Sequence, residues 1–309
     1  MFILARFYLS RKPGFMKTPQ QSYPKLAKAV GVPELYLKRE DLHKYGSHKG
    51  RSIPLMIKEY AKQGYASFAV SSSGNAALAA VRATIKHNQN NPKNPITLSV
   101  LIGERIRKEK KDILEKEING NSSLTLEQMP RPKQEGMTRE KEQKAKYLRQ
   151  SVDDLALVGY MELAEELNKL PGLSAIFIPT SSGTTAQGLG EAFLSALSEK
   201  PEIHIVQTDS CHPMVGEKTF EEHTPPSLAD AIVDIVGHRK KVVLDIIKKT
   251  NGGRWVADNA ALEEAKKIVK ETSGIDISYN SALSIAGLRQ AVAQGEKFFG
   301  PVVCLITGK

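Results

Sequence analysis

The sequence has few cysteines, and it has no long apolar run. Its 309 residues include only two cysteines, Cys211 and Cys304, and neither belongs to a Cys-x-x-Cys pair. This pattern argues against a disulfide framework or a cysteine zinc site and favours a reducing, cytoplasmic location. No apolar run approaches the roughly 20 residues of a transmembrane helix, and Met1–Leu9 lacks a signal-peptide cleavage site. We therefore expect no association with a membrane.

Aromatic residues are also scarce, which argues against nucleic-acid binding as the reason for the positive charge. The net charge is +10, but the chain has 1 tryptophan and 6% aromatic residues, and its basic residues are interleaved with acidic ones. Proteins that bind single-stranded nucleic acid use aromatic stacking platforms, and no such platform is visible. We expect no nucleic-acid partner. Six histidines have no metal-ligand spacing, so we expect no metal site: His43, His87, His204, His212, His223 and His238.

Two common nucleotide-binding motifs are absent. Gly183 and Gly188 have the spacing of a Walker loop, but Leu189 and Gly190 stand where that loop needs Lys and Ser or Thr. The dinucleotide fingerprint Gly-x-Gly-x-x-Gly does not occur either. The sequence therefore gives no support to a nucleotide enzyme of either type.

The composition is that of a globular α/β protein. Hydrophobic residues make up 40% and charged residues 25%. Apolar strand-like runs alternate with helix-like runs, which favours largely parallel sheets covered by helices. We expect strands at 35–38, 67–70, 97–102, 175–179, 203–208 and 302–306, and helices at 104–118, 160–170, 242–249 and 259–272. Residues 119–150 are polar and carry Pro130 and Pro132, so we expect an irregular surface segment there.

Lys49 is the strongest candidate for a reactive side chain. A short alternating strand, 35–38, leads into Gly46-Ser47-His48-Lys49-Gly50-Arg51, and an apolar helix-like run begins at Ile53. Lys49 thus lies near the start of a helix, where the helix dipole disfavours a charged ammonium. A neutral amine is a nucleophile. The alternative is that Lys49 is one more solvated lysine in a lysine-rich chain.

Two serine- and glycine-rich turns each join a strand to a helix. The first contains Ser72-Ser73-Gly74-Asn75, and the second runs from Thr180 to Gly190. Such a turn presents backbone N–H groups at a helix N-terminus and can bind an anion. The alternative for the first turn is an ordinary helix cap, since Ser and Asn are preferred there.

Together these motifs resemble the fold-type II pyridoxal-phosphate enzymes related to tryptophan synthase β, which include threonine synthase, serine/threonine dehydratases and cysteine synthase. Lys38-Arg39-Glu40-Asp41 followed by Gly46–Arg51 is similar to the family's K-x-E-[DN] and G-[SA]-[FH]-K-x-R patterns. In that family the matching lysine holds the cofactor as a Schiff base, which implies that Lys49 is catalytic. The resemblance also places His48 beside the cofactor.

The resemblance extends to the two turns. The family's S-[ST/A]-G-N loop binds the substrate carboxylate, which implies this role for Ser72, Ser73, Gly74 and Asn75, and its Asn hydrogen-bonds the cofactor's phenolic oxygen. The second turn resembles the family's phosphate loop, with serines in place of glycines. This implies that Ser181, Ser182, Gly183, Thr184 and Thr185 hold the cofactor phosphate.

The resemblance near the C-terminus is partial. Thr307 matches the residue that faces the cofactor's pyridine nitrogen in threonine synthase-like members. The family's E-P-S-[SG]-A pattern is reduced to Ser281-Ala282, preceded by Ser278-Tyr279-Asn280. The chain ends two residues after Thr307, where relatives usually continue.

The resemblance implies two three-layer α/β domains with mainly parallel sheets and the cofactor, pyridoxal 5'-phosphate, in the cleft between them. We expect one domain over 36–165, with Lys49 and the Ser72–Asn75 loop, and another over 166–309 with 1–35, carrying the phosphate loop. The implied activity is that of a pyridoxal-phosphate-dependent lyase: β- or γ-elimination or replacement on a hydroxy- or O-activated amino acid, threonine synthase-like or serine/threonine dehydratase-like, in a homodimer. The alternatives are cysteine synthase- or tryptophan synthase β-like replacement, or a cofactor-binding homologue with little turnover.

Overall fold

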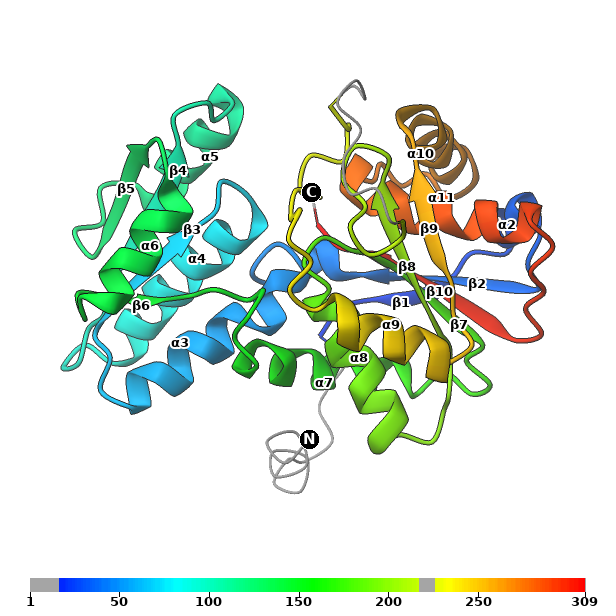
Figure 1. Ribbon diagram of the computed structural model, residues 1–309, viewed down its shortest axis with the longest axis horizontal. Coiled ribbons are helices and arrows are strands. Elements are labelled where there is room, and N and C mark those ends of the chain that lie inside the picture. The colour runs from blue at the N-terminus through cyan, green and yellow to red at the C-terminus, as the bar shows by residue number, and fades with distance from the viewer. Residues whose placement is uncertain (1–16, 217–225, 309) are drawn as a thin grey trace. The chain divides into compact units, whose positions relative to one another are not determined.

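The chain folds into two compact units in a computed structural model that describes residues 17–216 and 226–308. Of the described residues, one unit holds 17–43 and those from Tyr160 on, and the other is Lys44–Gly159. Figure 1 shows that each unit is built on its own sheet with helices packed against it.

The first unit has a six-stranded sheet. Its strands, in spatial order, are β1 (Gln20–Ser22), β2 (Glu34–Arg39), β10 (Pro301–Ile306), β7 (Ala175–Pro179), β8 (Glu202–Thr208) and β9 (Arg254–Ala257). β1 pairs with β2 in antiparallel fashion, and the other neighbours are parallel. The expected parallel α/β class is therefore confirmed.

Helices cover both faces of this sheet. α2 (Pro24–Val30), α10 (Asn259–Ser273) and α11 (Tyr279–Ala293) pack on one face, and α8 (Thr184–Ser195), α9 (Lys240–Lys249) and the part of α7 (Leu155–Leu167) from Tyr160 on pack on the other. The alternation along β7 explains this, because Phe177 joins the first core whereas Ile176 and Ile178 join the second. Strands buried on both faces are apolar throughout, as β7 is.

The second unit has a four-stranded parallel sheet. Its strands, in order, are β5 (Leu124–Met129), β4 (Thr97–Gly103), β3 (Ser67–Ser71) and β6 (Lys146–Tyr147). α3 (Ile53–Lys62), α4 (Asn75–Asn90) and α5 (Lys108–Ile118) share a core with Phe68 and Val70. α6 (Pro132–Lys141) packs on the other face, where Gly136 lets its backbone approach the ring of Tyr147.

The expectation of an irregular segment over 119–150 was wrong. This stretch contributes β5, α6 and β6 to the second unit. β5 alternates between a buried Leu124 and an exposed Thr125, as in a strand with one solvated face, so its polar composition hid a regular element. The short strand β9 was also not expected, and α5 begins at Lys108 rather than at residue 104.

The units divide the chain between residues 43 and 44 and between 159 and 160, whereas we expected boundaries at 35/36 and 165/166. The difference at the first boundary has a clear cause. β2 is the parallel neighbour of β10, so residues 36–39 belong to the sheet of the first unit. In the parts of the chain that the structure describes, no helix is long and apolar enough to cross a membrane.

Candidate active site

The turn before Lys49 is fixed by Gly46 and Ser47. Gly46 has φ +88°, and a Cβ there would lie 2.5 Å from Nη1 of Arg82 on α4, so the position requires glycine. The buried Ser47 accepts a hydrogen bond from the backbone N–H of Lys49 at 3.3 Å and begins a short 3-10 helix, η2 (His48–Arg51). Lys49 therefore lies in η2, just before α3 begins at Ile53.

Arg82 is itself held in place. It makes two hydrogen bonds to the carboxylate of Glu117, at 2.8 and 2.7 Å, which raise the pKa of Arg82 and lower that of Glu117. η2 packs against α4, the helix that begins at Asn75. The Lys49 turn therefore packs on the helix that follows the Ser72–Asn75 loop.

The side chain of Lys49 is available for chemistry. It is partly buried, and its Nζ makes no hydrogen bond or ion pair with any residue that the structure describes. His48 precedes it in η2 and is also partly buried. An amine without a partner at a fixed backbone position fits covalent attachment of an aldehyde cofactor.

The Ser72–Asn75 loop follows β3 and leads into α4. Ser72 accepts a hydrogen bond from the backbone N–H of Gly74 at 3.2 Å, which closes the turn. The side chains of Ser73 and Asn75 make no hydrogen bond with any other residue in the described ranges. The loop therefore offers unused polar groups at a helix N-terminus, which fits binding of a carboxylate.

The second predicted loop joins β7 to α8 in the first unit. Gly183 has φ +84°, and a Cβ there would lie 3.0 Å from both Met214 Cε and Val243 Cγ2. The backbone N–H groups of Ser181, Ser182 and Gly183 donate no hydrogen bond to any residue that the structure describes. Unused N–H donors at the start of a helix fit a phosphate group.

The hydroxyl groups of this loop have different surroundings. Ser182 Oγ lies 2.9 Å from Thr184 Oγ1, and the side chains of Thr184 and Thr185 are buried. Ser181 Oγ accepts hydrogen bonds from the backbone N–H groups of Val233 and Asp234, both at 3.2 Å. Sequence reasoning did not predict these contacts of Ser181.

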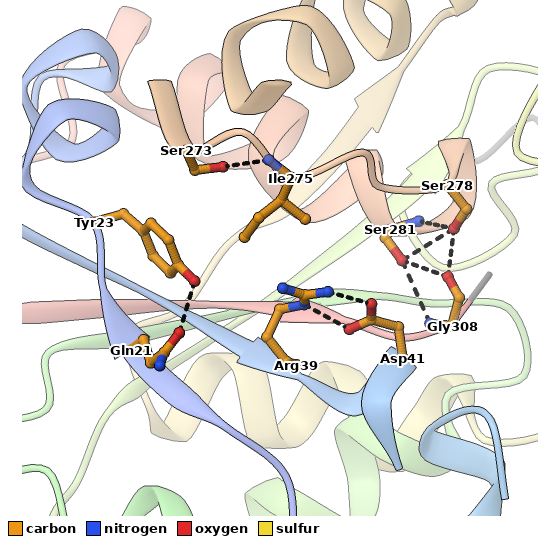
Figure 2. A network of polar contacts seen from close by, with 9 residues as sticks. All are labelled: Gln21, Tyr23, Arg39, Asp41, Ser273, Ile275, Ser278, Ser281 and Gly308. Atoms are coloured by element: carbon orange, nitrogen blue, oxygen red, sulfur yellow. Dashed lines mark hydrogen bonds and ion pairs between the residues drawn. The ribbon is translucent and has the colours of Figure 1, made fainter. Parts of the chain in front are cut away.

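Thr307 is buried at the end of β10, and the residue after it is fixed by two serines. The carbonyl oxygen of Gly308 accepts hydrogen bonds from Ser278 Oγ at 2.5 Å and from Ser281 Oγ at 2.9 Å, as Figure 2 shows. Ser278 also caps α11 by accepting the N–H of Ser281. The altered Ser278–Ala282 region therefore holds the Thr307-Gly308 segment.

The Lys38–Asp41 motif is structural in the first unit. Lys38 is fully buried, and its Nζ donates to the Thr18 carbonyl at 3.0 Å and to Glu166 Oε2 at 2.5 Å. The buried Glu40 accepts from Thr18 Oγ1 at 2.5 Å. Buried charges need such partners, so the motif attaches β2 to the segment before it and to α7. Asp41 pairs with Arg39 at 2.7 Å and raises its pKa (Figure 2).

The histidines give no sign of a metal site. The described residues contain no group of three or more His, Cys, Asp or Glu that could hold a metal ion. His204 instead stacks on Phe177 with ring centroids 4.3 Å apart, and its Nδ1 accepts a hydrogen bond from Trp255 Nε1 at 3.1 Å. His223 lies outside the described residues.

The predicted site residues thus form two groups. Lys49, His48 and the Ser72–Asn75 loop lie in the second unit, and the Ser181–Thr185 loop and Thr307 lie in the first. Within the first unit, the loop and Thr307 follow β7 and β10, which are parallel neighbours, so both lie at the carboxyl edge of one sheet. Ligands of open α/β sheets bind at this edge.

Two curated proteins are similar to this chain. Threonine synthase from Methanocaldococcus jannaschii is 24% identical over 318 aligned residues, covering 94% of this chain and 74% of that protein. Human L-serine dehydratase/L-threonine deaminase is 41% identical over 75 residues, 24% of this chain and 23% of that protein.

Among solved structures, a pyridoxal 5'-phosphate-dependent aspartate racemase has a TM-score of 0.81 at 19% identity, covering 99% of this chain and 94% of that one. Threonine deaminase from Solanum lycopersicum has a TM-score of 0.76 at 20% identity, covering 94% and 79%. These likenesses confirm the expected fold. The family described as "Pyridoxal-phosphate dependent enzyme" matches residues 12–308, and the chain belongs to that family, whose cofactor is pyridoxal 5'-phosphate.

Proposed function

We propose that this enzyme catalyses β- or γ-elimination or replacement on a hydroxy- or O-activated amino acid. The observation that carries the proposal is Thr307, a buried hydroxyl at the carboxyl end of β10. In threonine synthase-like relatives the matching residue faces the pyridine nitrogen. A hydroxyl does not stabilise a protonated pyridine as a carboxylate would. Electron withdrawal into the ring is then weaker, which favours prompt loss of a leaving group over transamination.

Residues of both units supply the groups that this chemistry needs. The cofactor, when bound, withdraws electrons from the α-carbon of an attached amino acid. Lys49 Nζ accepts the proton when the α-carbon–hydrogen bond breaks, and it returns or relays that proton later. His48 packs beside the cofactor, and Asn75 hydrogen-bonds its phenolic oxygen. Ser72, Ser73 and Gly74 orient the substrate carboxylate.

The phosphate end is assigned to the first unit. The unused N–H groups of Ser181, Ser182 and Gly183 and the hydroxyls of Thr184 and Thr185 bind the phosphate oxygens. The helix N-terminus and these neutral donors contribute to the attraction.

The names of the relatives agree with a hydroxy amino acid as substrate. They include threonine synthase, cysteate synthase, threonine deaminase and L-serine ammonia-lyase. Threonine and serine carry oxygen on the β-carbon, and a synthase substrate can carry an activated oxygen on the β- or γ-carbon. An elimination on such compounds breaks that carbon–oxygen bond after the α-proton has moved to Lys49.

Racemisation is the second candidate, and Ser73 is the observation that favours it. Aspartate racemase and serine racemase are among the structural neighbours. Racemisation needs a second proton carrier besides Lys49, and the Ser73 hydroxyl makes no hydrogen bond with the described part of the chain. Ser73 belongs to the loop assigned to the substrate carboxylate.

A product assay separates these activities. Purified protein is supplied with cofactor and then with serine, threonine and their O-phospho and O-acetyl derivatives. We expect a keto acid with ammonia, or a replacement product when a nucleophile is added. Inversion of the α-carbon without loss of the leaving group would favour racemisation. Efficient transamination, with no elimination or replacement on any of these compounds, would overturn the proposal.

We also propose that the enzyme acts in the cytoplasm as a homodimer. The location rests on the two isolated cysteines, and the assembly rests on the family resemblance. Light scattering of the purified protein would test the assembly, and a monomer at micromolar concentration would contradict it.

A further inference from the structure

Two positions at which the chain departs from the family's sequence pattern contact the same segment of backbone. Ser181 stands where the phosphate loop of the family has glycine, and Asn280 lies in the altered region before Ser281. Asn280 Oδ1 accepts the backbone N–H of Ala231 at 3.0 Å, and its Nδ2 donates to Asp230 Oδ1 at 3.3 Å. Ser181 Oγ accepts the backbone N–H groups of Val233 and Asp234. We call residues 230–234 the tethered segment.

The tethered segment depends on these polar contacts for its order. Ile232 is buried in the core of the first unit, but Ala231 and Val233 on either side of it are exposed, Val233 by 61%. The next residue pair, Ile235 and Val236, is exposed by 59% and 63%. With one apolar anchor, burial contributes little to fixing this backbone. The hydrogen bonds that the segment makes with Ser181 and Asn280 add to this anchor, as does the bond from the Ile232 N–H to the Ala229 carbonyl at 3.2 Å.

The hydrogen bonds to Ser181 also determine what its hydroxyl can do. A hydroxyl has two acceptor lone pairs and one proton. Both lone pairs of Ser181 Oγ are engaged by the N–H groups of Val233 and Asp234, so its proton is left to donate. Hydrogen bonds in such a chain polarise one another: a group that donates becomes a better acceptor. Donation by Ser181 to an anion would therefore strengthen its two bonds to the tethered segment.

We infer that Ser181 and Asn280 are positioning residues that couple the order of the tethered segment to occupation of the cofactor-phosphate loop. This inference rests on the proposed role of the Ser181–Thr185 loop. Coupling between two sites is reciprocal, so phosphate binding orders the segment, and an ordered segment strengthens phosphate binding by the same factor. The altered region around Asn280 is then part of the cofactor site rather than a sign of lost activity.

Amide hydrogen exchange followed by NMR tests the coupling at the residues concerned. Two probes are compared in the wild type: pyridoxal 5'-phosphate, and pyridoxal, which lacks the phosphate. We expect pyridoxal 5'-phosphate, but not pyridoxal, to slow exchange at Val233 and Asp234 by about fivefold or more. Ser181→Ala should abolish this difference and weaken pyridoxal 5'-phosphate binding by the same factor, with pyridoxal binding unchanged.

Three further variants make the result specific. Ser181→Thr keeps the hydroxyl and should restore the effect. Ser182→Ala removes a neighbouring hydroxyl without touching the tethered segment, so the phosphate-dependent protection of Val233 and Asp234 should persist. Asn280→Ala should raise exchange at Ala231 and reduce phosphate-dependent protection further along the segment.

The outcomes distinguish a failure of the proposed function from a failure of the inference about Ser181 and Asn280. Suppose the wild type binds pyridoxal 5'-phosphate and pyridoxal equally well. The phosphate loop then lies elsewhere, and the proposed function fails with it. If instead the wild type prefers pyridoxal 5'-phosphate and Ser181→Ala binds and exchanges like the wild type, the inference alone is overturned.

Discussion

The proposed chemistry assigns both cofactor attachment and transfer of the α-proton to one amine, Lys49 Nζ. Its Nζ has no partner among the described residues, and Gly46 and Ser47 fix its backbone. We expect borohydride treatment of the cofactor-loaded protein to fix the cofactor on Lys49, which peptide mapping would show. Lys49→Ala should lose covalent attachment. The exposed Lys44, five positions earlier, offers a matched control, and Lys44→Ala should bind as the wild type does. Attachment to another lysine would contradict the assignment.

We propose that Thr307 sets the type of reaction. Thr307→Asp would put a carboxylate where a hydroxyl stands and would favour a protonated pyridine. We expect elimination to slow by on the order of tenfold, which is about 1.4 kcal/mol of barrier, and side transamination to rise. Both products are assayed with serine and threonine. Because the site is buried, Thr307→Ser serves as a control for packing and should retain elimination. An unchanged product ratio in a folded Thr307→Asp protein would disprove this role.

The sequence predicted those turns that depend on short-range spacing. The Gly46–Lys49 turn and the step from β7 to Gly183 can be recognised because a strand, a small-residue turn and a helix follow one another directly. The roles of Ser181 and Asn280 could not be predicted, because their partners lie about 50 positions away in a segment with no regular structure. Tertiary hydrogen bonds of this kind leave no period in a sequence.

At the scale of elements, the turn from β7 to α8 depends on Gly183. Its positive φ disfavours other side chains, and a Cβ there would lie 3.0 Å from Met214 Cε and from Val243 Cγ2, so these side chains would have to shift. In Gly183→Asp a carboxylate would also face the phosphate. We expect affinity for pyridoxal 5'-phosphate to fall by on the order of tenfold or more, about 1.4 kcal/mol, in a fluorescence titration.

The control for Gly183→Asp is a second glycine with the same kind of backbone. Gly172 has φ +69°, but a Cβ there would meet no atom within 4 Å. Gly172→Asp therefore introduces similar backbone strain without crowding the phosphate loop, and its cofactor affinity should stay at the wild-type value. Equal losses in the two variants would mean that strain, and not the phosphate site, causes the effect.

The segment between α5 and β6 shows where composition misled the prediction. Arg139 on α6 makes hydrogen bonds to both carboxylate oxygens of Glu127 on β5, at 2.9 and 2.6 Å, and also pairs with Glu135. The charged composition suggested a solvated surface segment. The Arg139–Glu127 pair instead joins α6 to β5. A sequence does not reveal the Arg139–Glu127 pair, because its partners lie on different elements, unlike Arg139 and Glu135, which are four residues apart on α6.

The Arg139–Glu127 ion pair makes the stability of the second unit depend on pH in the acid range. The hydrogen bonds from Arg139 lower the pKa of Glu127 from 4.5 to about 2. A carboxyl whose pKa is depressed on folding stabilises the fold above its ordinary pKa, and this contribution is lost as the pH falls from 4.5 towards 2. We expect Glu127→Gln to lower the unfolding midpoint at neutral pH and to reduce its fall across that window, as measured by thermal unfolding against pH.

A surface glutamate provides the comparison. Glu115 pairs with Lys111 at 3.7 Å, and both side chains are well exposed, so the pair contributes little. Glu115→Gln should leave the profile nearly unchanged. If Glu127→Gln and Glu115→Gln gave the same profile, the Arg139 contact would not stabilise the unit.

At the scale of the whole molecule, the α/β class and the parallel sheets followed from the alternation of strands and helices, but the division of the chain did not. β2 lies early in the sequence and pairs with β10 at the far end, so the first unit is assembled from both ends of the chain. Local patterns mark where a strand begins, but they do not say which strand it pairs with. Only the resemblance predicted two domains. The expected boundaries were 35/36 and 165/166, and the observed ones are 43/44 and 159/160, a difference of up to eight residues.

The division of the site residues between two units leads to a prediction about linkage. Each unit has its own sheet and its own core, so each can open separately. A ligand that binds only the folded form of a unit stabilises that unit against opening, by about 2.7 kcal/mol at a concentration 100 times its dissociation constant. On the proposed assignment of the site, inorganic phosphate would engage only the loop after β7, and pyridoxal 5'-phosphate would engage Lys49 as well.

Amide hydrogen exchange in the two sheets distinguishes a ligand that engages one unit from a ligand that engages both. Inorganic phosphate should protect β7 and β10 of the first unit and leave β3 and β4 of the second unchanged. Pyridoxal 5'-phosphate should protect all four strands, because the proposal assigns its ring end to Lys49 and Asn75. In Lys49→Ala the protection of β3 and β4 should fall while that of β7 and β10 persists. Protection confined to one unit in the wild type with pyridoxal 5'-phosphate would mean that the cofactor does not engage both groups of residues, and the site would have to be built from one unit alone.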